Sequence, residues 1–435
     1  MAAHHVIIFF RASVPYLAPL RGAIRSLRTT TCGCSQPERN VRFKTKMVEQ
    51  EFRVVEFYSG IGGMHFALKE CGINATVVAA LDINTVANQV YQHNFPLTKI
   101  FQRNIESISL KEFQALNADV FLMSPPCQPF TRSGKQGDNE DPRTKSFLYI
   151  LNLFGRLEKQ PSHILVENVK GFETSETRNL LLQTLSACNY VYKEFLLSPY
   201  HLGIPNQRLR YFLVAKQRPH QFVSDYLLEN GHLLDNYLIE NSASSNDELK
   251  ERRNELAAEG SEGASEKHAL KVPKAASLSQ QKDQFSNYLP NRTIKMYLEE
   301  LPDIVTEEHK IDAKVLIRYG KVMDIVTEEC ERTMCFTKAY FHYIEGTGSV
   351  LQMNKTLQKS EVFQSLESTD DDLDKCEILK NLNVRYFTSK EIANLHHLPP
   401  DFSFPKEITR KQQYKLLGNS LNSHVVSVLL RFMFS

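Results

Sequence analysis

A cysteine that directly follows two prolines is the strongest candidate nucleophile in this chain. The segment DVFLMSPPCQPF runs from a short apolar stretch into Ser124, Pro125, Pro126 and Cys127. Each proline fixes φ and removes a backbone donor, so this loop should be stiff. A thiolate held there could add to C6 of a pyrimidine, which makes C5 enamine-like and able to take a methyl group. Taken alone, a free cysteine is more often a buried, inert thiol.

Three further side chains could assist an attack on a pyrimidine ring. Attack at C6 pushes electron density onto N3 and O2, and a carboxylic acid that donates to N3 would stabilise the adduct. Glu167, in the run VENV, suits that role. Arg208 and Arg210 precede a strand, where alternation puts both on one face and their guanidinium groups could hold O2 or a phosphate. The ordinary alternatives are a surface acid and surface ion pairs.

A glycine-rich turn followed by an acid indicates a binding site for a nucleoside-type cofactor. Ser59–Gly63 reads SGIGG between a strand-like and a helix-like segment, and Asp82 ends the next strand. Such a turn offers backbone N–H groups, and the acid can accept hydrogen bonds from both hydroxyls of a ribose. A NAD site and a purely structural turn remain alternatives on these two features.

The elements that must position these residues alternate between strand and helix. This alternation predicts an α/β fold with a mostly parallel, Rossmann-like sheet flanked by helices. Gly72 should end the first helix in a left-handed cap, and apolar residues at helical spacing predict another helix near Phe147–Leu157. The expected strands are Arg53–Tyr58, Thr76–Leu81, Val120–Met123, Ile164–Val166 and Tyr211–Ala215.

The composition divides the chain into five parts. We expect an N-terminal extension over 1–46, a main α/β domain over 50–216, a linker with a disordered insertion over 217–289, a small lobe over 290–384 and a return to the main domain over 385–435. No apolar run is long enough for a membrane-spanning helix. The cysteines show neither disulfide-like nor zinc-like pairing, which favours free thiols in a reducing compartment.

The first 46 residues differ in charge from the rest of the chain. They hold eight Lys or Arg residues and one acid; removing these from totals of 52 and 50 leaves 44 basic and 49 acidic residues. Nucleic-acid binding by the main body would therefore need a local basic patch. The extension resembles a mitochondrial transit peptide, but we favour an upstream start or transcript variant, because Met47 lies just before the first strand.

Together these motifs resemble the cytosine-C5 methyltransferase family. FYSGIGG, Asp82, SPPCQPF, ENVKGF, QRLRYF and KLLGNSLN occur in the family's order. The resemblance implies S-adenosyl-L-methionine (SAM) as cofactor, a target-recognition role for the small lobe, and no metal. It assigns Cys127 as nucleophile, Glu167 as acid, and Arg208 and Arg210 as substrate-orienting residues. The residues that it implies for the cofactor are Phe57, Gly60, Ile61, Gly62, Gly63, Asp82, Ile83, Asn104, Ile105, Glu106, Ser124, Pro125, Asn419 and Ser420.

Within this family the chain is most similar to the branch that methylates cytosine 38 in the anticodon loop of tRNA-Asp. CFTK at Cys335–Lys338, YIEGTGS at Tyr343–Ser349 and KSFLYIL at Lys145–Leu151 carry that resemblance. One departure is His396-His397, where the family usually has a Leu-Gly-Phe-Pro-like turn. This departure leaves the local packing uncertain but touches no expected catalytic position.

The resemblance to this branch implies tRNA as the partner, with weak or no activity on duplex DNA. An anticodon-loop base is already unpaired, whereas a duplex base must first be flipped out. A DNA methyltransferase and a catalytically silent nucleic-acid-binding protein are the alternatives. We expect a monomer without membrane association in the cytoplasm, with the nucleus as an alternative. A mitochondrial location is expected only if residues 1–46 act as a transit peptide.

Overall fold

The apolar runs of the first half of the chain form one seven-stranded sheet. The computed structural model describes residues 51–126, 144–224, 226–228, 234–239, 292–300, 302 and 307–435. The expected extension over 1–46, most of the predicted insertion and Cys127 therefore lie outside the described residues.

The sheet has the strand order β3-β2-β1-β4-β5-β7-β6. Parallel pairing joins β3 through β5, and β7 pairs antiparallel with both of its neighbours. The prediction of a mostly parallel α/β sheet is confirmed, and all five expected strands are present. The strands are β1 (Phe52–Phe57), β2 (Ala75–Leu81), β3 (Ile100–Phe101), β4 (Val120–Met123), β5 (His163–Val169), β6 (Tyr190–Leu197) and β7 (Arg210–Gln217).

The sequence pattern did not predict β6, because its polar residues interrupt the apolar run. Glu194 lies in the middle of this strand and is completely buried. Arg178 donates to Glu194 through two nitrogens, at 2.9 and 2.6 Å, and the Tyr211 hydroxyl donates to it at 2.7 Å. A buried carboxylate can be accommodated when it is paired in this way, but an acid in a sequence pattern normally indicates a surface position.

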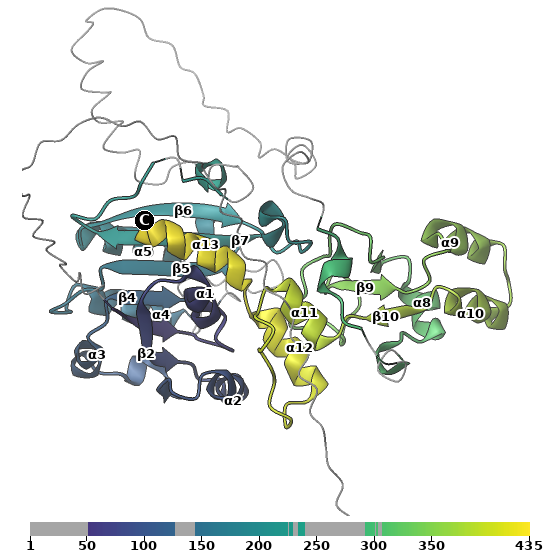
Figure 1. The fold of residues 1–435 in the computed structure, drawn as a ribbon, viewed down its shortest axis with the longest axis horizontal. Helices are drawn as coiled ribbons and strands as arrows, with labels where there is room; N and C mark the ends of the chain where they lie inside the picture. The colour runs from purple at the N-terminus through teal and green to yellow at the C-terminus, as the bar shows by residue number, and fades with distance from the viewer. Residues whose placement is uncertain are drawn as a thin grey trace, which may run out of the picture. The chain divides into compact units, whose positions relative to one another are not determined.

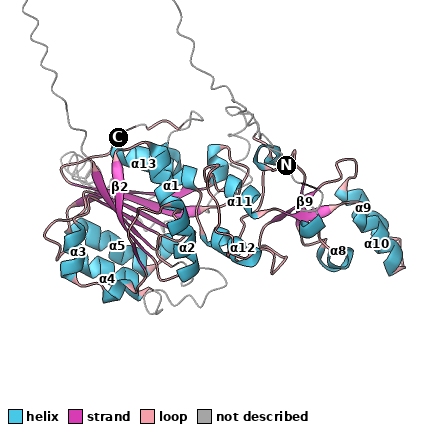
Figure 2. Ribbon diagram, turned by 60° about the horizontal axis from the view of Figure 1, so that its bottom comes forward, coloured by secondary structure: helices cyan, strands magenta, loops and turns pink. Residues whose placement is uncertain are grey.

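Helices cover both faces of this sheet (Figure 1). One face packs against α3, α4 and α5, and the other packs against α1 and α13. Figure 2 shows the two helical layers with the strands between them. Gly72 adopts φ 76° at the end of α1, which confirms the left-handed cap. The helices are α1 (Gly63–Cys71), α2 (Thr85–Asn94), α3 (Leu110–Leu116), α4 (Lys145–Phe154), α5 (Glu176–Ala187) and α13 (Ser423–Phe434).

The predicted small lobe contains its own three-stranded sheet, in the order β10-β9-β8. Its apolar side chains form a separate core cluster with α8, α9 and α10. β10 contains residues 384–386, so this strand crosses the boundary that the sequence suggested at 384/385. The elements are α8 (Ala313–Tyr319), β8 (Asp324–Val326), β9 (Ser349–Gln352), α9 (Lys359–Glu367), α10 (Asp372–Lys380) and β10 (Val384–Tyr386).

After β10 the chain returns to the large sheet through α11 (Ser389–Leu395), α12 (Arg410–Asn419) and α13. A buried ion pair joins β10 to α11: Arg385 donates to both carboxylate oxygens of Glu391, at 2.8 and 2.7 Å. We call residues 387–435 the return segment. Among the described residues, no helix is both long and apolar enough to cross a membrane.

Candidate active site

A cavity of about 630 Å³ opens where β1, β2, β4 and β5 end. In a parallel sheet the carboxyl ends of the strands meet at one edge, which is where α/β folds bind ligands. Most of the residues predicted from the sequence line this one cavity. These lining residues are Gly60, Ile61, Gly63, Asp82, Ile83, Asn104, Ile105, Glu106, Ser124, Pro125, Glu167, Arg208, Arg210, Asn419 and Ser420.

The glycine-rich turn and Asp82 form one wall of the cavity. Asp82 Oδ2 accepts from the Gly60 backbone N–H at 2.8 Å, and Oδ1 accepts from the Asn84 N–H at 2.8 Å. Burial raises the pKa of Asp82, although these backbone donors oppose the shift. Gly60 has φ 54°, a left-handed conformation that favours glycine, and a Cβ there would meet no atom within 4 Å. The turn therefore presents open backbone to the cavity.

This wall fits the ribose and the amino-acid group of SAM. The Ser59 hydroxyl is buried and has no hydrogen-bond partner among the described residues. A buried polar group without a partner is unfavourable unless a ligand or water bonds to it. The Asp82 carboxylate, the Ser59 hydroxyl and the open Gly60 backbone offer the mixed donors and acceptors that a ribose and an amino-acid group require.

Two of the predicted cofactor residues are not among the residues that line the cavity. The ring of Phe57 packs in the core, 5.7 Å from Phe113 and 5.0 Å from Phe121 between ring centroids. Its carbonyl accepts from the Ser124 N–H at 3.3 Å. Gly62 has φ 89°, and a Cβ there would lie 2.5 Å from the Phe95 ring. Gly62 thus allows helix α1 to approach α2 closely.

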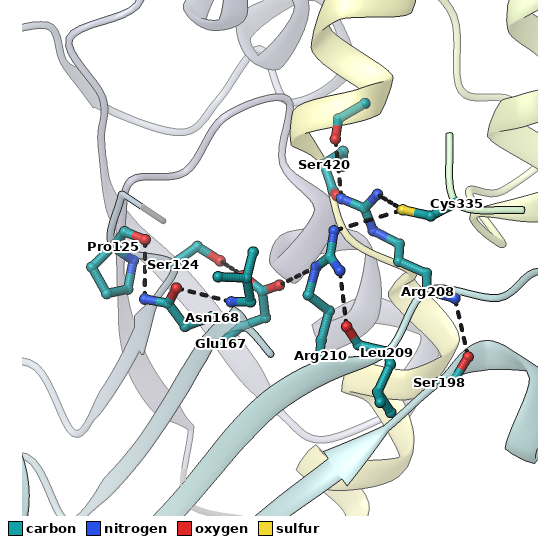
Figure 3. Close-up of polar contacts among 12 residues, drawn as sticks. Ser124, Pro125, Glu167, Asn168, Ser198, Arg208, Leu209, Arg210, Cys335 and Ser420 are labelled. Carbon is teal, nitrogen blue, oxygen red and sulfur yellow. Dashed lines mark hydrogen bonds and ion pairs between the residues drawn. The ribbon is translucent and has the colours of Figure 1, made fainter. Parts of the chain in front are cut away.

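The second wall holds the predicted acid and one of the predicted arginines (Figure 3). The Ser124 hydroxyl donates to Glu167 Oε2 at 3.0 Å, and Arg210 Nε lies 3.6 Å from Glu167 Oε1. Asn168 Nδ2 donates to the Pro125 carbonyl at 3.4 Å, which ties β5 to the start of the Pro-Pro loop. Glu167 is thereby held beside the loop that leads to Cys127.

Arg208 makes different contacts from Arg210, although both side chains reach the same cavity. Arg208 is 3% exposed and donates to the carbonyls of Phe336, Gly418 and Ser420. Figure 3 shows its guanidinium beside the Cys335 thiol, 3.2 Å from Nη1 to Sγ. Arg208 therefore fastens the return segment and the small lobe to β7.

Cys335 lies between the two arginines. In the sequence it was notable only as the first residue of the CFTK motif, which resembles one branch of the family. Arg210 Nη2 is 3.8 Å from its sulfur. Burial raises the pKa of this thiol, but the charges and hydrogen bonds of Arg208 and Arg210 together outweigh burial, so the net pKa lies below the ordinary value. Burial, and then the charge of Arg210, lowers the pKa of Arg208.

Sequence reasoning missed several lining residues, and Glu56 is the most informative of them. It is 1% exposed in β1 and accepts from the Tyr91 hydroxyl at 2.5 Å and from the His65 N–H at 3.1 Å. Burial raises its pKa to about 8, against these hydrogen bonds. The sequence does mark Glu56 as unusual, because it is the one acid inside the apolar run VVEFY. The other lining residues that the sequence did not suggest include Tyr58, Met64, Asn84, Ala87, Arg103, Ser146, Val169, Leu416 and Leu421.

Comparisons with known proteins identify the family of this chain. The sequence model of the family described as C-5 cytosine-specific DNA methylase matches residues 52–435. The chain is 47% identical over 395 residues to the human tRNA (cytosine(38)-C(5))-methyltransferase, covering 88% of this chain and 100% of that protein. It is 36% identical to a Dictyostelium discoideum DNA (cytosine-5)-methyltransferase, covering 89% of this chain and 95% of the relative.

A crystal structure of a mutant of Spodoptera frugiperda DNMT2 has the same fold, with a TM-score of 0.68 and 36% identity. The similarity covers 88% of this chain and all of that one. The match therefore includes the large sheet, the small lobe and the return segment together. The chain belongs to the cytosine-C5 methyltransferase family, whose members use SAM as the methyl donor.

Proposed function

We propose that this protein transfers a methyl group from SAM to C5 of cytosine 38 in the anticodon loop of tRNA-Asp. The observation that carries the proposal is the position of Glu167. Ser124 and Arg210 hold its carboxyl group at the edge of the cavity, beside the loop that leads to Cys127. The name of the human relative supports cytosine 38 of a tRNA as the target.

In this proposal the cofactor is held by one wall of the cavity. Asp82 would accept hydrogen bonds from the ribose hydroxyls, and the Gly60–Gly63 turn, Asn104–Glu106 and Asn419–Ser420 would surround the rest of the molecule. When bound, SAM supplies an electrophilic methyl group. The raised pKa of Asp82 indicates a carboxylate that is poorly solvated in the free protein. Ribose hydroxyl donors would replace the water that it lacks.

The other wall would activate the base. The Cys127 thiolate adds to C6 of cytosine, while Glu167 donates a proton toward N3 and thereby neutralises the charge that develops there. C5 then takes the methyl group, a base removes the C5 proton, and elimination restores the Cys127 thiolate. Arg210 lies against Glu167 and is therefore the arginine that we assign to orient the base at O2. Arg208 makes its hydrogen bonds to backbone carbonyls, so we assign it a positioning role.

Two considerations favour RNA over duplex DNA as the substrate. A base in an anticodon loop is unpaired, so its extraction avoids the cost of opening a base pair. The described part of the small lobe offers only a three-stranded sheet and three helices for reading the major groove. DNA remains the second candidate, because the Dictyostelium relative is named as a DNA methyltransferase.

Methylation with radiolabelled SAM tests the proposal on three substrates: a tRNA-Asp transcript, the same transcript with uridine at position 38, and duplex DNA. We expect label only in the first. The Cys127→Ala variant should lose this activity and keep its affinity for SAM, whereas Cys188→Ala, at a free cysteine that does not line the cavity, should stay active. Faster labelling of the duplex would overturn the RNA assignment, and turnover by Cys127→Ala would overturn the mechanism.

We further propose that the protein acts as a monomer in the cytoplasm. Size-exclusion chromatography with light scattering checks the first point. Imaging of the tagged full chain beside a chain that starts at Met47 checks the second, and a mitochondrial signal for the full chain alone would assign residues 1–46 as a transit peptide.

A further inference from the structure

Two histidines and one glutamate converge on the side of the sheet covered by α1 and α13, outside the residues that line the cavity. Glu70 lies in the last turn of α1, His397 lies two residues beyond the end of α11, and His424 lies in the first turn of α13. Glu70 Oε1 is 2.5 Å from His424 Nδ1, and Glu70 Oε2 is 3.7 Å from His397 Nδ1. The three potential ligand atoms all lie within 4.8 Å of one another.

The backbone at His397 shows that this convergence requires an unusual conformation. His397 has φ 58°, a left-handed value that glycine adopts readily and a histidine rarely does. Two hydrogen bonds from Ser423 fix the turn: its N–H donates to the His396 carbonyl at 2.9 Å, and its hydroxyl donates to the His397 carbonyl. The turn therefore holds the His397 ring beside Glu70, where it also lies 4.7 Å from the His424 ring.

We propose that Glu70, His397 and His424 form a binding site for a first-row transition-metal ion, with Zn²⁺ as the expected occupant. Two imidazoles and one carboxylate are a donor set that Zn²⁺ prefers, whereas Mg²⁺ and Ca²⁺ prefer oxygen donors. Glu70 and His397 have side chains that are 26% and 37% exposed, so water can supply the fourth ligand. The two histidine nitrogens and the glutamate oxygen lie close enough together for one ion to bind all three after small side-chain rotations.

The neighbours of this cluster would both support and limit metal binding. The Ser427 hydroxyl donates to Glu70 Oε1 at 2.9 Å and would keep orienting the carboxylate. Arg431 Nη2 donates to the Glu70 carbonyl at 3.2 Å and lies 3.9 Å from Oε1, so its positive charge opposes a second cation. Lys69 does not compete, because its ammonium lies over the Phe95 ring. The ion would therefore approach from Oε2 and His397, the more exposed side of the cluster.

A metal at this position would join helix α1 to the return segment. The N-terminal end of α1 is at the cavity, where a Cβ on Gly63 would meet Leu421 at 3.1 Å and Ser420 at 3.3 Å. The same two parts of the chain thus meet twice, once at the cavity and once at the histidine cluster. A bound ion would stabilise the folded state by an amount that grows with the logarithm of its concentration above the dissociation constant.

The test measures Zn²⁺ binding to the metal-stripped full chain, by competition with a chromophoric chelator. We expect one site that is weakened about tenfold or more in His397→Gly and in Glu70→Gln. Glycine suits φ 58°, so His397→Gly should fold, and Glu70→Gln keeps an oxygen for Ser427. His342→Ala, which removes an exposed histidine elsewhere, should bind as the natural chain does.

Two further measurements separate this site from adventitious binding to thiols. Co²⁺ in the proposed site should give the weak visible bands of nitrogen and oxygen ligands without a strong thiolate charge-transfer band. Zn²⁺ should raise the melting temperature of the natural chain and of His342→Ala, but not of His397→Gly. Equal affinity in the natural chain and both cluster variants would overturn the proposal, as would a thiolate spectrum, and the cluster would then be a hydrogen-bonded contact only.

Discussion

Arg208 and Arg210 are separated by one residue, but their surroundings differ in a way that sequence alternation cannot predict. Arg208 lies just before β7 and Arg210 begins it; both line the same cavity, and both approach Cys335. Arg208 is buried and bonds to three carbonyls of the small lobe and the return segment, while Arg210 faces Glu167. Arg208 therefore stabilises the packing of the small lobe and the return segment, whereas Arg210 contacts Glu167.

Lysine substitutions should distinguish these two arginines. Arg208→Lys replaces a planar fork with a point charge that cannot reach all three carbonyls, so we expect a loss of about 3 kcal/mol in the free energy of unfolding. Arg210→Lys should change stability by less than about 1 kcal/mol but lower kcat strongly. Urea unfolding and single-turnover methylation measure the two effects. Equal losses of stability would contradict the assignment.

Asp82 connects the glycine turn to the proposed ribose site. Asp82→Asn keeps the shape but replaces a charged acceptor for the Gly60 N–H with a neutral one. Because hydrogen bonds to charged groups contribute about 1.5–3 kcal/mol, the dissociation constant for SAM should rise about tenfold or more. Calorimetry measures this. Asp119→Asn, whose carboxylate bonds to Arg53 and Lys159 away from the cavity, is the matched control and should bind SAM normally.

Glu56 should make stability depend on pH. Its pKa of about 8 in the folded protein exceeds its ordinary value of 4.5, so the folded state binds more protons than the unfolded state between these values. The stabilisation that Glu56 contributes is therefore fully present below pH 4.5 and falls as the pH rises toward 8, by at most about 1.4 kcal/mol per pH unit.

Glu56→Gln should remove this dependence. The amide imitates the protonated acid: it can accept from the His65 N–H and donate to the Tyr91 oxygen, while the Tyr91 hydroxyl donates to His65 Nδ1. Urea unfolding at pH 5 and pH 8 should give similar stabilities for the two proteins at pH 5 and a more stable variant at pH 8. Parallel pH profiles would show that Glu56 is ionised in the folded protein throughout.

Helix α12 contains Gly418, although glycine is a poor helix former. A Cβ on Gly418 would lie 2.2 Å from the backbone of both Thr337 and Lys338. Backbone atoms cannot move aside as a flexible side chain can. This close approach brings the carbonyl of Gly418 to Arg208, and it explains why GNS in the return segment lies opposite CFT in the small lobe.

Gly418→Ala should therefore destabilise the protein, although alanine normally stabilises a helix by about 1 kcal/mol relative to glycine. We expect a net loss of about 2 kcal/mol or more, because the clash exceeds the propensity gain. Gly155→Ala is the matched control: this glycine ends α4 with ordinary backbone angles, and a Cβ there meets nothing within 4 Å. Urea unfolding should show no loss for this control, and a neutral Gly418→Ala would contradict the packing argument.

For the whole molecule, the sequence predicted the features that depend on neighbouring residues, such as the strands and their ends. It did not predict the features that depend on contacts with residues far away in the chain. Apolar runs ending in Asp82, Ser124 and Glu167 predicted which strand ends form the site, because parallel strands end at a common edge. The strand β6 could not be predicted, since Glu194 is neutralised by Arg178 from another element. The position of Cys335 was equally hidden, because its neighbours lie more than 120 residues away in the chain.

The return segment also has a consequence for how the protein is made. Helix α13 covers the face of the sheet that begins folding with β1 and α1, and Glu70 and His424, which join the two helices, are 354 residues apart. A nascent chain from which α13 has not yet emerged must leave that apolar face uncovered. We therefore expect the cavity to be completed, and SAM to bind, only after α13 has packed against α1.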